Sequence, residues 1–193
     1  MQNSDKSLVD AHCKGSTTAF AELLQRYGSI VLGFLIQMTG NYQQAEDLFQ
    51  ETFKRLHEKA DSFRGTNLKP WLLKIATNMA INNSRKNKNL KLISLDQEIE
   101  CKNGNCEKPA NITITDNPLN KLLNAEYKEQ LRQAVSLLPP KQRATLVLAY
   151  YHQLTYPEVA TTLGCSLGTV KTQMYRALKK LNQKLPDPGG ETK

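Results

Sequence analysis

The part of this chain that most constrains its fold lies near the carboxyl end, where residues 158–170 read EVATTLGCSLGTV. Two helices that cross closely need a small residue at the crossing, and Ala160 stands at that position. Gly164 follows four residues later with the backbone freedom of a tight turn, and Ser166 is placed to cap a second helix. Val170 then stands where an apolar side chain packs back on the first helix. The spacing predicts a helix-turn-helix, although a helical hairpin that binds nothing has the same outline.

The second predicted helix carries basic and hydrogen-bonding side chains that suit a nucleic acid. The whole chain is also basic: 26 Lys and Arg stand against 18 Asp and Glu, which gives a formal net charge of +8 and a sequence pI near 9.3. A polyanionic partner fits this charge, but many ribosomal and membrane-surface proteins share it. The polar faces of the helix hold Lys171, Thr172, Gln173, Tyr175 and Arg176.

Helical periodicity also dominates the first half of the chain. Apolar residues recur at helical spacing through residues 1–90, and no alternating strand pattern competes with them. We therefore expect an all-α fold. The expected helices cover 6–13, the stretch from a cap at Ser16 to Gly40, 42–59, and the stretch from Leu68 onward with Pro70 in its first turn.

A connector divides the chain. Helical periodicity is lost between about residues 87 and 118, where Gly104, Pro109 and Pro118 occur, and this stretch is acidic between two basic blocks. We expect two small helical domains joined by a flexible linker, the second of them the helix-turn-helix domain. The expected boundaries are 1–90 for the first domain, 91–117 for the linker, 118–185 for the second domain and 186–193 for a tail.

Composition and motifs argue against a membrane protein and against an enzyme. The apolar run at 30–38 is too short to span a bilayer, and the first residues lack the basic-then-apolar order of a secretion signal, so we expect a cytoplasmic protein. The sequence shows no phosphate-cradling glycine loop, no histidine-centred acid–base cluster and no complete set of metal ligands. We therefore expect no enzymatic activity, catalytic residue, metal, cofactor or small-molecule substrate.

The four cysteines fit a cytoplasmic location. Cys13 and Cys165 lie in predicted helical or turn segments and are expected to be small buried residues. Cys101 and Cys106 lie in the connector, where they are compatible with a redox-sensitive dithiol, with half of a zinc site or with a plain linker. The sequence leaves these three alternatives open.

Two polar surfaces stand out on the predicted helices of the first domain. One is an acidic cluster within two helical turns, formed by Glu46, Asp47, Gln50 and Glu51. It is either a functional acidic patch or an ordinary solvated helix face. From Asn78 onward the next helix carries amides and cations, which can contact base edges and phosphates. A helix that frays into a polar linker explains the second surface equally well.

Four motifs occur in order along the chain: DLFQETF at 47–53, FRG at 63–65, WLLKIATN at 71–78, and LPPKQR at 138–143 ahead of the helix-turn-helix. Together they resemble a bacterial sigma factor of the extracytoplasmic-function (ECF) group in the sigma-70 family, with regions two and four and no region three between them. The resemblance covers about residues 8–90 and 118–184.

The resemblance implies a role for each matched segment. In this family the helix with the Asp-x-x-Gln-Glu-x-Phe pattern docks on the β′ clamp of core RNA polymerase, and region four also meets the β flap. The implied polymerase-binding residues are Asp47, Leu48, Gln50, Glu51 and Phe53. The residues implied for the minus-ten promoter element, where an unstacked base is captured, are Phe63, Arg64, Asn67, Lys69, Trp71, Lys74, Asn78, Asn82, Arg85 and Lys86. Those implied for the minus-thirty-five element are Ser166, Thr169, Lys171, Thr172, Gln173, Arg176 and Lys179, although many relatives carry Ser-Arg in place of Thr172-Gln173.

The function that the resemblance implies is that of an alternative sigma factor, which binds core RNA polymerase and directs promoter recognition and DNA melting for transcription initiation. The competing hypothesis is a stand-alone helix-turn-helix transcriptional regulator, whose first domain receives a signal or dimerises. Sigma factors of this group are commonly held inactive by an anti-sigma factor, often a membrane-anchored one, so such a partner is expected beside core polymerase and promoter DNA. No residue identifies this partner, the inducing signal or the promoter sequence.

Overall fold

A computed structural model of the chain describes residues 4–93 and 129–185, with side chains described for residues 4–86 and 129–185. Within these ranges every regular element is a helix, so the all-α prediction is confirmed. The tail at 186–193, the cysteines Cys101 and Cys106, and all of the expected linker beyond residue 93 lie outside the described residues.

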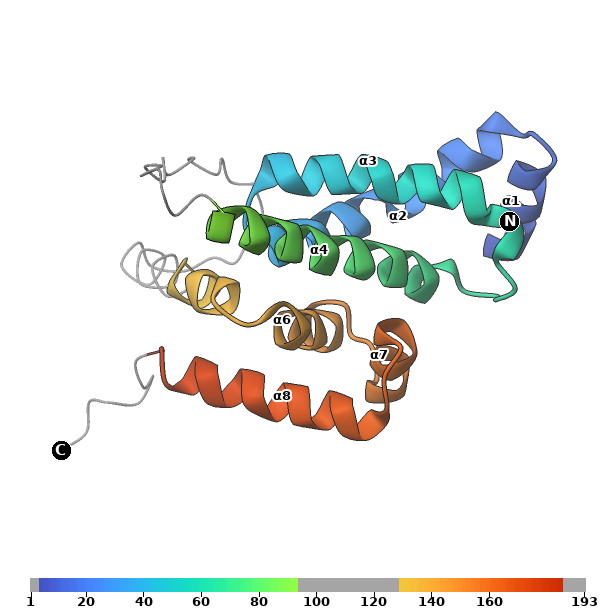
Figure 1. The fold of residues 1–193 in the computed structure, drawn as a ribbon. Helices are drawn as coiled ribbons and strands as arrows, with labels where there is room; N and C mark the ends of the chain where they lie inside the picture. The colour runs from blue at the N-terminus through green and yellow to red at the C-terminus, as the bar shows by residue number, and fades with distance from the viewer. Residues whose placement is uncertain (1–3, 94–128, 186–193) are drawn as a thin grey trace, which may run out of the picture.

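The first domain is a bundle whose long helices lie side by side (Figure 1). Helix α1 (Asp5–Cys13) precedes α2 (Thr17–Thr39) and α3 (Tyr42–Lys59), and a short 3-10 turn, η1 (Ala60–Ser62), leads toward α4 (Leu68–Ile93). These bounds agree with the expected helices to within a residue or two at each described start. The agreement arises because the capping residues are local signals.

Two caps illustrate this local control. Ser16 is the N-cap of α2, where its hydroxyl accepts a hydrogen bond from the Ala19 amide at 3.3 Å. The helix ends at Gly40, whose φ of 69° is left-handed and costs glycine little. Asn41 then caps α3 at once by accepting a hydrogen bond from the Gln44 amide at 2.9 Å. One helix therefore stops and the next begins within two residues, which places α2 and α3 antiparallel.

Helix α2 supplies much of the apolar core of this domain. Leu23, Phe34 and Leu35 are fully buried against residues of α3 and α4 that include Leu56 and Leu72. By length and composition α2 also meets the criteria for a membrane-spanning helix, with a mean hydropathy of 1.3 over its most apolar window. This differs from our expectation, which considered only the run at 30–38. Within that window 33% of the residues are buried, and the buried apolar residues of α2 pack in the bundle.

The second domain contains the predicted helix-turn-helix. A helical segment at residues 129–136 is followed by α6 (Pro140–Leu146), the π-helical η2 (Val147–Tyr151), α7 (Tyr156–Leu163) and α8 (Leu167–Asn182). Gly164 ends α7 with a left-handed φ of 63°, and the Ser166 hydroxyl accepts the Thr169 amide at 3.2 Å to cap α8. Ala160 and Val170 are buried as predicted.

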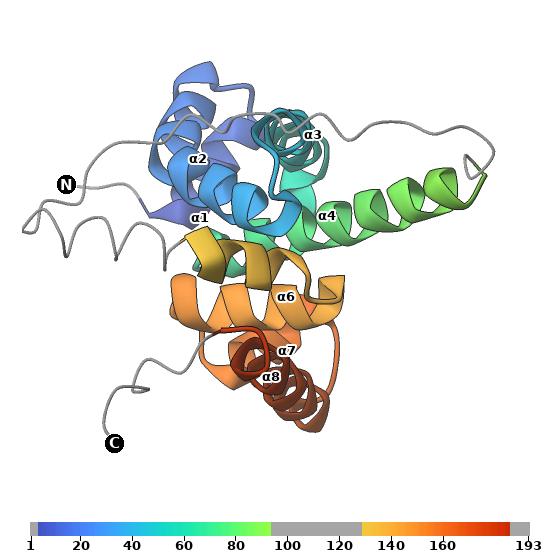
Figure 2. The ribbon, with the colours of Figure 1, turned by 90° about the vertical axis from the view of Figure 1, so that its left-hand side faces the viewer.

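The two domains pack against each other, which the sequence did not predict. Helices α6 and α7 lie against α4, with further contacts between α2 and both α6 and η2 (Figures 1 and 2). Apolar residues of the second domain, including Val147, Leu148 and Val159, join the core of the first domain in one continuous cluster. Around this cluster, Lys69 Nζ donates to the His152 carbonyl at 3.0 Å, and the Phe34 and His152 rings meet edge to face at 5.5 Å.

Two further features differ from expectation. Helix α4 continues to Ile93, beyond the boundary at residue 90, and its end projects from the body of the protein in Figure 2. Loss of apolar period therefore did not mark the end of the helix. Cys13 is exposed and Cys165 is half-buried, so the expectation of two buried cysteines was wrong for Cys13. Cys13 ends α1, whose buried residues Leu8 and Val9 lie one turn earlier.

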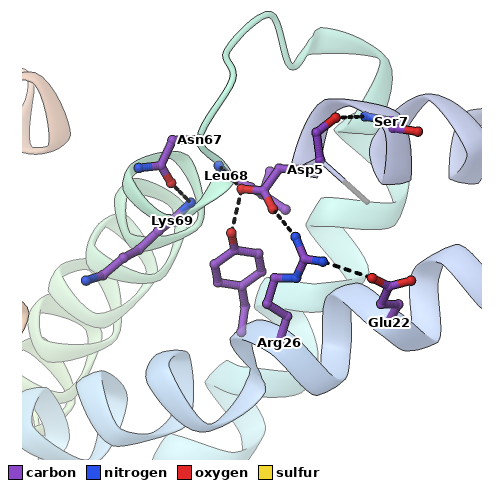
Figure 3. A network of polar contacts seen from close by, with 9 residues as sticks. Asp5, Ser7, Glu22, Arg26, Asn67, Leu68 and Lys69 are labelled. Carbon is purple, nitrogen blue, oxygen red and sulfur yellow. Dashed lines mark hydrogen bonds and ion pairs between the residues drawn. The ribbon is translucent and has the colours of Figure 1, made fainter. Parts of the chain in front are cut away.

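A buried carboxylate ties three helices together at one end of the bundle (Figure 3). Asp5 accepts hydrogen bonds from Arg26 Nη1 at 2.7 Å, from the Tyr27 hydroxyl, and from the Leu68 amide at 2.8 Å. Burial alone would raise the pKa of Asp5, but the hydrogen bonds from Leu68, Tyr27 and Arg26 outweigh it and lower that pKa. Burial, followed by the hydrogen bond to Asp5, raises the pKa of Tyr27 to about 12. The ionised form of Asp5 is therefore the one that stabilises the fold.

We predict that Asp5→Asn lowers the free energy of unfolding by about 2 to 3 kcal/mol at pH 7, because the amide cannot accept all three donors of the buried carboxylate. The folded-state pKa is depressed, so the stabilisation is present above the unfolded pKa, near 3.9, and is lost as pH falls through the folded value. Urea denaturation of both proteins between pH 7 and pH 2.5 should show their difference shrinking toward acid.

The matched control for this prediction is Asp10→Asn, which changes an exposed carboxylate on the same helix. Its stability should stay within about 0.5 kcal/mol of the original chain at pH 7. An Asp5→Asn variant as stable as this control would contradict the structural role of the carboxylate.

Candidate nucleic-acid and polymerase interfaces

The acidic cluster on α3 presents a small exposed surface. Asp47 and Gln50 are exposed, and neither makes a hydrogen bond or ion pair within the described part of the chain. Glu51 is half-buried and pairs with Arg55 at 3.4 Å, a surface pair worth little by itself. Leu48 is half-buried, whereas Phe53 is only 5% exposed and packs against Phe49 with ring centroids 4.8 Å apart. The structure thus brings four of the five expected polymerase-binding residues to the surface and places Phe53 in the core.

The loop before α4 is built around a buried aromatic residue. Phe63 is buried and meets Trp71 edge to face, with ring centroids 5.9 Å apart. A Cβ on Gly65 would stand 3.1 Å from Phe63 Cε2, so a larger residue here would require the Phe63 ring to shift by a few tenths of an ångström. Arg64 is exposed and donates to backbone carbonyls of its own loop, and the Asn67 side chain accepts the Lys69 amide at 3.1 Å. Contacts within the loop and with the start of α4 therefore support its shape.

Beyond its first turn, α4 presents a stripe of exposed amides and cations. The residues of this stripe, named at the end of this paragraph, are spaced three or four positions apart. This spacing places them along one side of the helix. None of them makes a hydrogen bond or ion pair with the described residues, so their polar groups are available to a ligand. Lys69 and Trp71 are half-buried, and Lys69 already contacts the second domain through His152. The exposed stripe consists of Lys74, Asn78, Asn82, Arg85 and Lys86.

On α8 the expected contact residues divide into structural and free groups. Ser166 is engaged as the cap with Thr169, and the Thr172 hydroxyl donates to the Gly168 carbonyl at 2.9 Å. Gln173 is half-buried, whereas Lys171, Arg176 and Lys179 are exposed and have no polar partner among the described residues. The three cations thus remain free to contact phosphates or base edges.

One exposed side chain of α8, expected on its polar faces, was left out of the residues implied for the minus-thirty-five element. Tyr175 is 67% exposed on the same helix as Lys171 and Arg176, and no described residue packs its ring into the core. Its position four residues after Lys171 and three after Thr172 places it on the exposed face. That spacing was present in the sequence and could have added Tyr175 to the candidates.

A cavity of about 350 Å³ lies where the two domains meet. Residues from the middle of α4, from the start of α6 and from α8 line it. Arg85, expected at the minus-ten element, and Arg176, expected at the minus-thirty-five element, therefore stand on the same cavity. The packed arrangement brings together residues that were expected to contact separate DNA elements.

The domain interface buries polar groups that lack partners. Arg143 donates to the Met38 carbonyl and to carbonyls of its own domain, but its Nε has no partner, and burial lowers its pKa. His152 Nε2 is also buried without a partner, and burial together with the charge of Lys69 lowers the pKa of His152 to about 4. His152 is therefore neutral at pH 7. In residues 4–86 and 129–185, no three histidine, cysteine or carboxylate side chains converge as metal ligands.

Comparison with known proteins gives matches to both domains. Residues 23–90 match the family model described as Sigma-70 region 2, and residues 128–181 match the one described as Sigma-70, region 4. The chain is 31% identical over 175 residues to the ECF RNA polymerase sigma factor SigW of Bacillus subtilis, which covers 90% of this chain and 92% of that protein. It is 32% identical over 160 residues to SigM of the same organism, covering 83% and 91%.

Solved structures show the same fold. The sigma factor RpoE of Bartonella quintana, solved in complex with the anti-sigma factor NepR, matches with a TM-score of 0.66 and 27% identity over 85% of this chain and 94% of that one. CnrH, solved with the cytosolic domain of CnrY, matches with a TM-score of 0.64 at 20% identity, over 94% and 96% of the two chains. From its motifs, its two helical domains and these relatives, this chain belongs to the ECF sigma factors of the sigma-70 family, the DNA-binding factors that direct transcription initiation.

Proposed function

We propose that three exposed faces divide the work of this sigma factor: α3 binds core RNA polymerase, α4 holds the opened minus-ten element, and α8 contacts the minus-thirty-five duplex. The observation that carries the proposal is that each face exposes polar side chains without partners in the described structure. Unpaired exposed groups cost a protein nothing in water, and they are available for charge-assisted contacts when a partner arrives.

The α3 face suits a basic partner. Asp47 and Gln50 project from the helix beside Glu51, and this small negative patch stands out in a chain with a net charge of +8. We propose that it docks on the β′ clamp, with Leu48 adding apolar contact at its edge. Phe53 supports this face from inside by packing with Phe49. We propose that the second domain binds the β flap of the polymerase.

The α4 face suits single-stranded DNA. Extruding a base from a duplex costs a few kcal/mol, which a pocket recovers only when the base fits. The ordered loop around Phe63 supplies a preformed shape, and the amides of Asn78 and Asn82 can hydrogen-bond to a base edge. Lys74, Arg85 and Lys86 neutralise the adjacent phosphates. Recognition and melting of the minus-ten element are then one event.

Promoter engagement requires the two domains to separate. Promoter elements about two turns of DNA apart are roughly 68 Å from each other, whereas Arg85 and Arg176 line one cavity in the packed arrangement. The interface is suited to opening, because the orphaned Arg143 Nε and His152 Nε2 each forfeit about 1 to 3 kcal/mol when buried and regain water when exposed. We propose that the packed form is the unbound state and that polymerase holds the domains apart.

We extend the proposal to regulation and location. The related RpoE was solved with an anti-sigma factor, which supports a partner of the same class here. Such a partner, soluble or membrane-anchored, blocks the sigma factor when it covers the exposed α3 face. The chain then acts in the cytoplasm, where RNA polymerase transcribes, and contributes specificity rather than catalysis.

In-vitro transcription over a genomic promoter library tests the function as a whole. Core RNA polymerase with the purified chain should start RNA at a limited set of defined sites that core enzyme alone does not use. The stand-alone regulator hypothesis would be favoured if the chain alone bound a promoter duplex tightly at physiological salt while the mixture with core enzyme gave no specific transcript.

The α3 face gives a prediction about polymerase binding. Replacing Asp47 and Gln50 together with alanine should weaken the affinity for core polymerase about tenfold or more, since both side chains are exposed and unpaired. Stability to urea should change by less than about 0.5 kcal/mol. Glu58→Ala, eleven residues beyond Asp47 on the same helix and exposed, is the control and should bind normally. Unchanged affinity of the double variant would refute the assignment of this face.

The α4 face gives a prediction about DNA opening. Asn78→Ala should reduce open-complex formation, measured by permanganate reactivity of unpaired thymines, by about tenfold because one base-edge contact is lost. Binding to core polymerase should stay within twofold. Gln25→Ala removes an exposed amide from α2 and should leave both measurements unchanged. Loss of core binding together with melting would show instead that the substitution damaged the helix.

A further inference from the structure

The cavity between the domains is lined by positive charge. Its charged lining residues are all cations, Arg85 from α4, Lys141 from α6 and Arg176 from α8, and no carboxylate lines it. None of the three side chains makes an ion pair or hydrogen bond with another residue of the described chain. The three side chains are exposed, so water and salt screen most of their mutual repulsion, and a bound anion would neutralise what remains.

A buried hydrogen-bond acceptor in the cavity also lacks a partner. Gln142 lines the cavity, is only 8% exposed, and its Oε1 has no hydrogen-bond partner. A buried amide without partners forfeits hydrogen bonds that water would supply. The two ends of a glutamine amide are exchanged by a simple rotation, so the group can donate its N–H₂ to a ligand in the cavity.

The rest of the lining is suited to a flat apolar group. Ile81, Pro139 and Pro140 contribute aliphatic surface, and Gln173 adds a second amide. A volume of about 350 Å³ is at the lower end of the range for small-molecule sites, which suits one nucleotide rather than a dinucleotide. The charge also matches, since a terminal phosphate carries up to about two negative charges at pH 7 and an inner phosphate adds a third.

We infer that this cavity is a binding site for a nucleoside diphosphate. The phosphates lie among Arg85, Lys141 and Arg176, where the guanidinium groups can form bidentate hydrogen bonds with them. The base lies against the prolines, and the glutamine amides lie at its edge. Because α4 and α8 belong to different domains, the site exists only when the domains are packed. Bound nucleotide therefore stabilises the closed form.

A consequence for regulation rests on the function proposed above. A ligand that binds only the closed form opposes any partner that needs the open form, and the coupling is reciprocal. Promoter engagement and nucleotide binding would then compete for Arg85 and Arg176. The binding measurement itself uses the free chain without polymerase or DNA, so its failure is distinguishable from a failure of the proposed function.

The test is calorimetric titration of the full-length free chain with ADP, pyrophosphate and adenosine at physiological salt. We expect ADP to saturate with a dissociation constant on the order of 10 to 100 µM, pyrophosphate to bind at least about tenfold more weakly, and adenosine to show no saturation. Failure of ADP to saturate at millimolar concentration would overturn the site. Equal binding of pyrophosphate would overturn the nucleoside part.

Variants separate this site from general attraction of anions to a basic protein. Lys141→Glu should abolish ADP binding, and Arg85→Ala should weaken it at least about tenfold, because each loses a charge-assisted contact. Lys54→Glu makes the same charge change at an exposed position on α3 outside the cavity and should bind ADP within twofold of the original chain. Equal losses in Lys141→Glu and Lys54→Glu, or normal binding by Arg85→Ala, would contradict a site shared by the two domains.

Discussion

The buried carboxylate of Asp5 fixes where the DNA-facing helix begins. It accepts the Leu68 amide, the first of α4, while Arg26 and Tyr27 hold it from α2. An amide at a helix start has no partner within its own helix, so a carboxylate there satisfies it and interacts favourably with the helix dipole. The register of every exposed residue on α4 follows from that start. The nearby Phe63 loop leads directly into this helix start.

Each domain and the interface between them follow different rules. Inside the first domain, apolar side chains such as Phe34 and Leu72 are fully buried, and among its described residues Gln37 Oε1 is the one buried side-chain atom without a hydrogen-bond partner. At the interface, apolar residues join one cluster, but Arg143, Gln142 and His152 are left with unpaired polar atoms. The apolar contacts allow such an interface to form. Its buried polar atoms without hydrogen-bond partners favour its opening. A factor that has to present two faces at distant DNA sites needs both properties.

The sequence predicted what local chemistry controls and missed what tertiary contacts control. Ser16, Gly40, Gly164 and Ser166 marked helix ends because each acts on amides a few residues away. The contact of Arg143 with the Met38 carbonyl joins residues 105 positions apart, and no periodicity encodes it. For the candidate faces, spacing located the exposed residues of α3, α4 and α8, but motif matching also included the buried Phe53. A sequence motif contains both the exposed residues of a helix face and the buried residues that pack beneath it.

Electrostatics links these observations. Both domains are basic, so packing them brings positive charge together, most directly around the cavity lined by Arg85, Lys141 and Arg176. The apolar cluster stabilises the closed form against this repulsion, and a small anion strengthens it by neutralising the cations in place. Promoter DNA neutralises the same cations, but its phosphates lie along an extended duplex and can serve both domains only when they are apart. The geometry of the anion, compact or extended, then determines which arrangement the same charges favour.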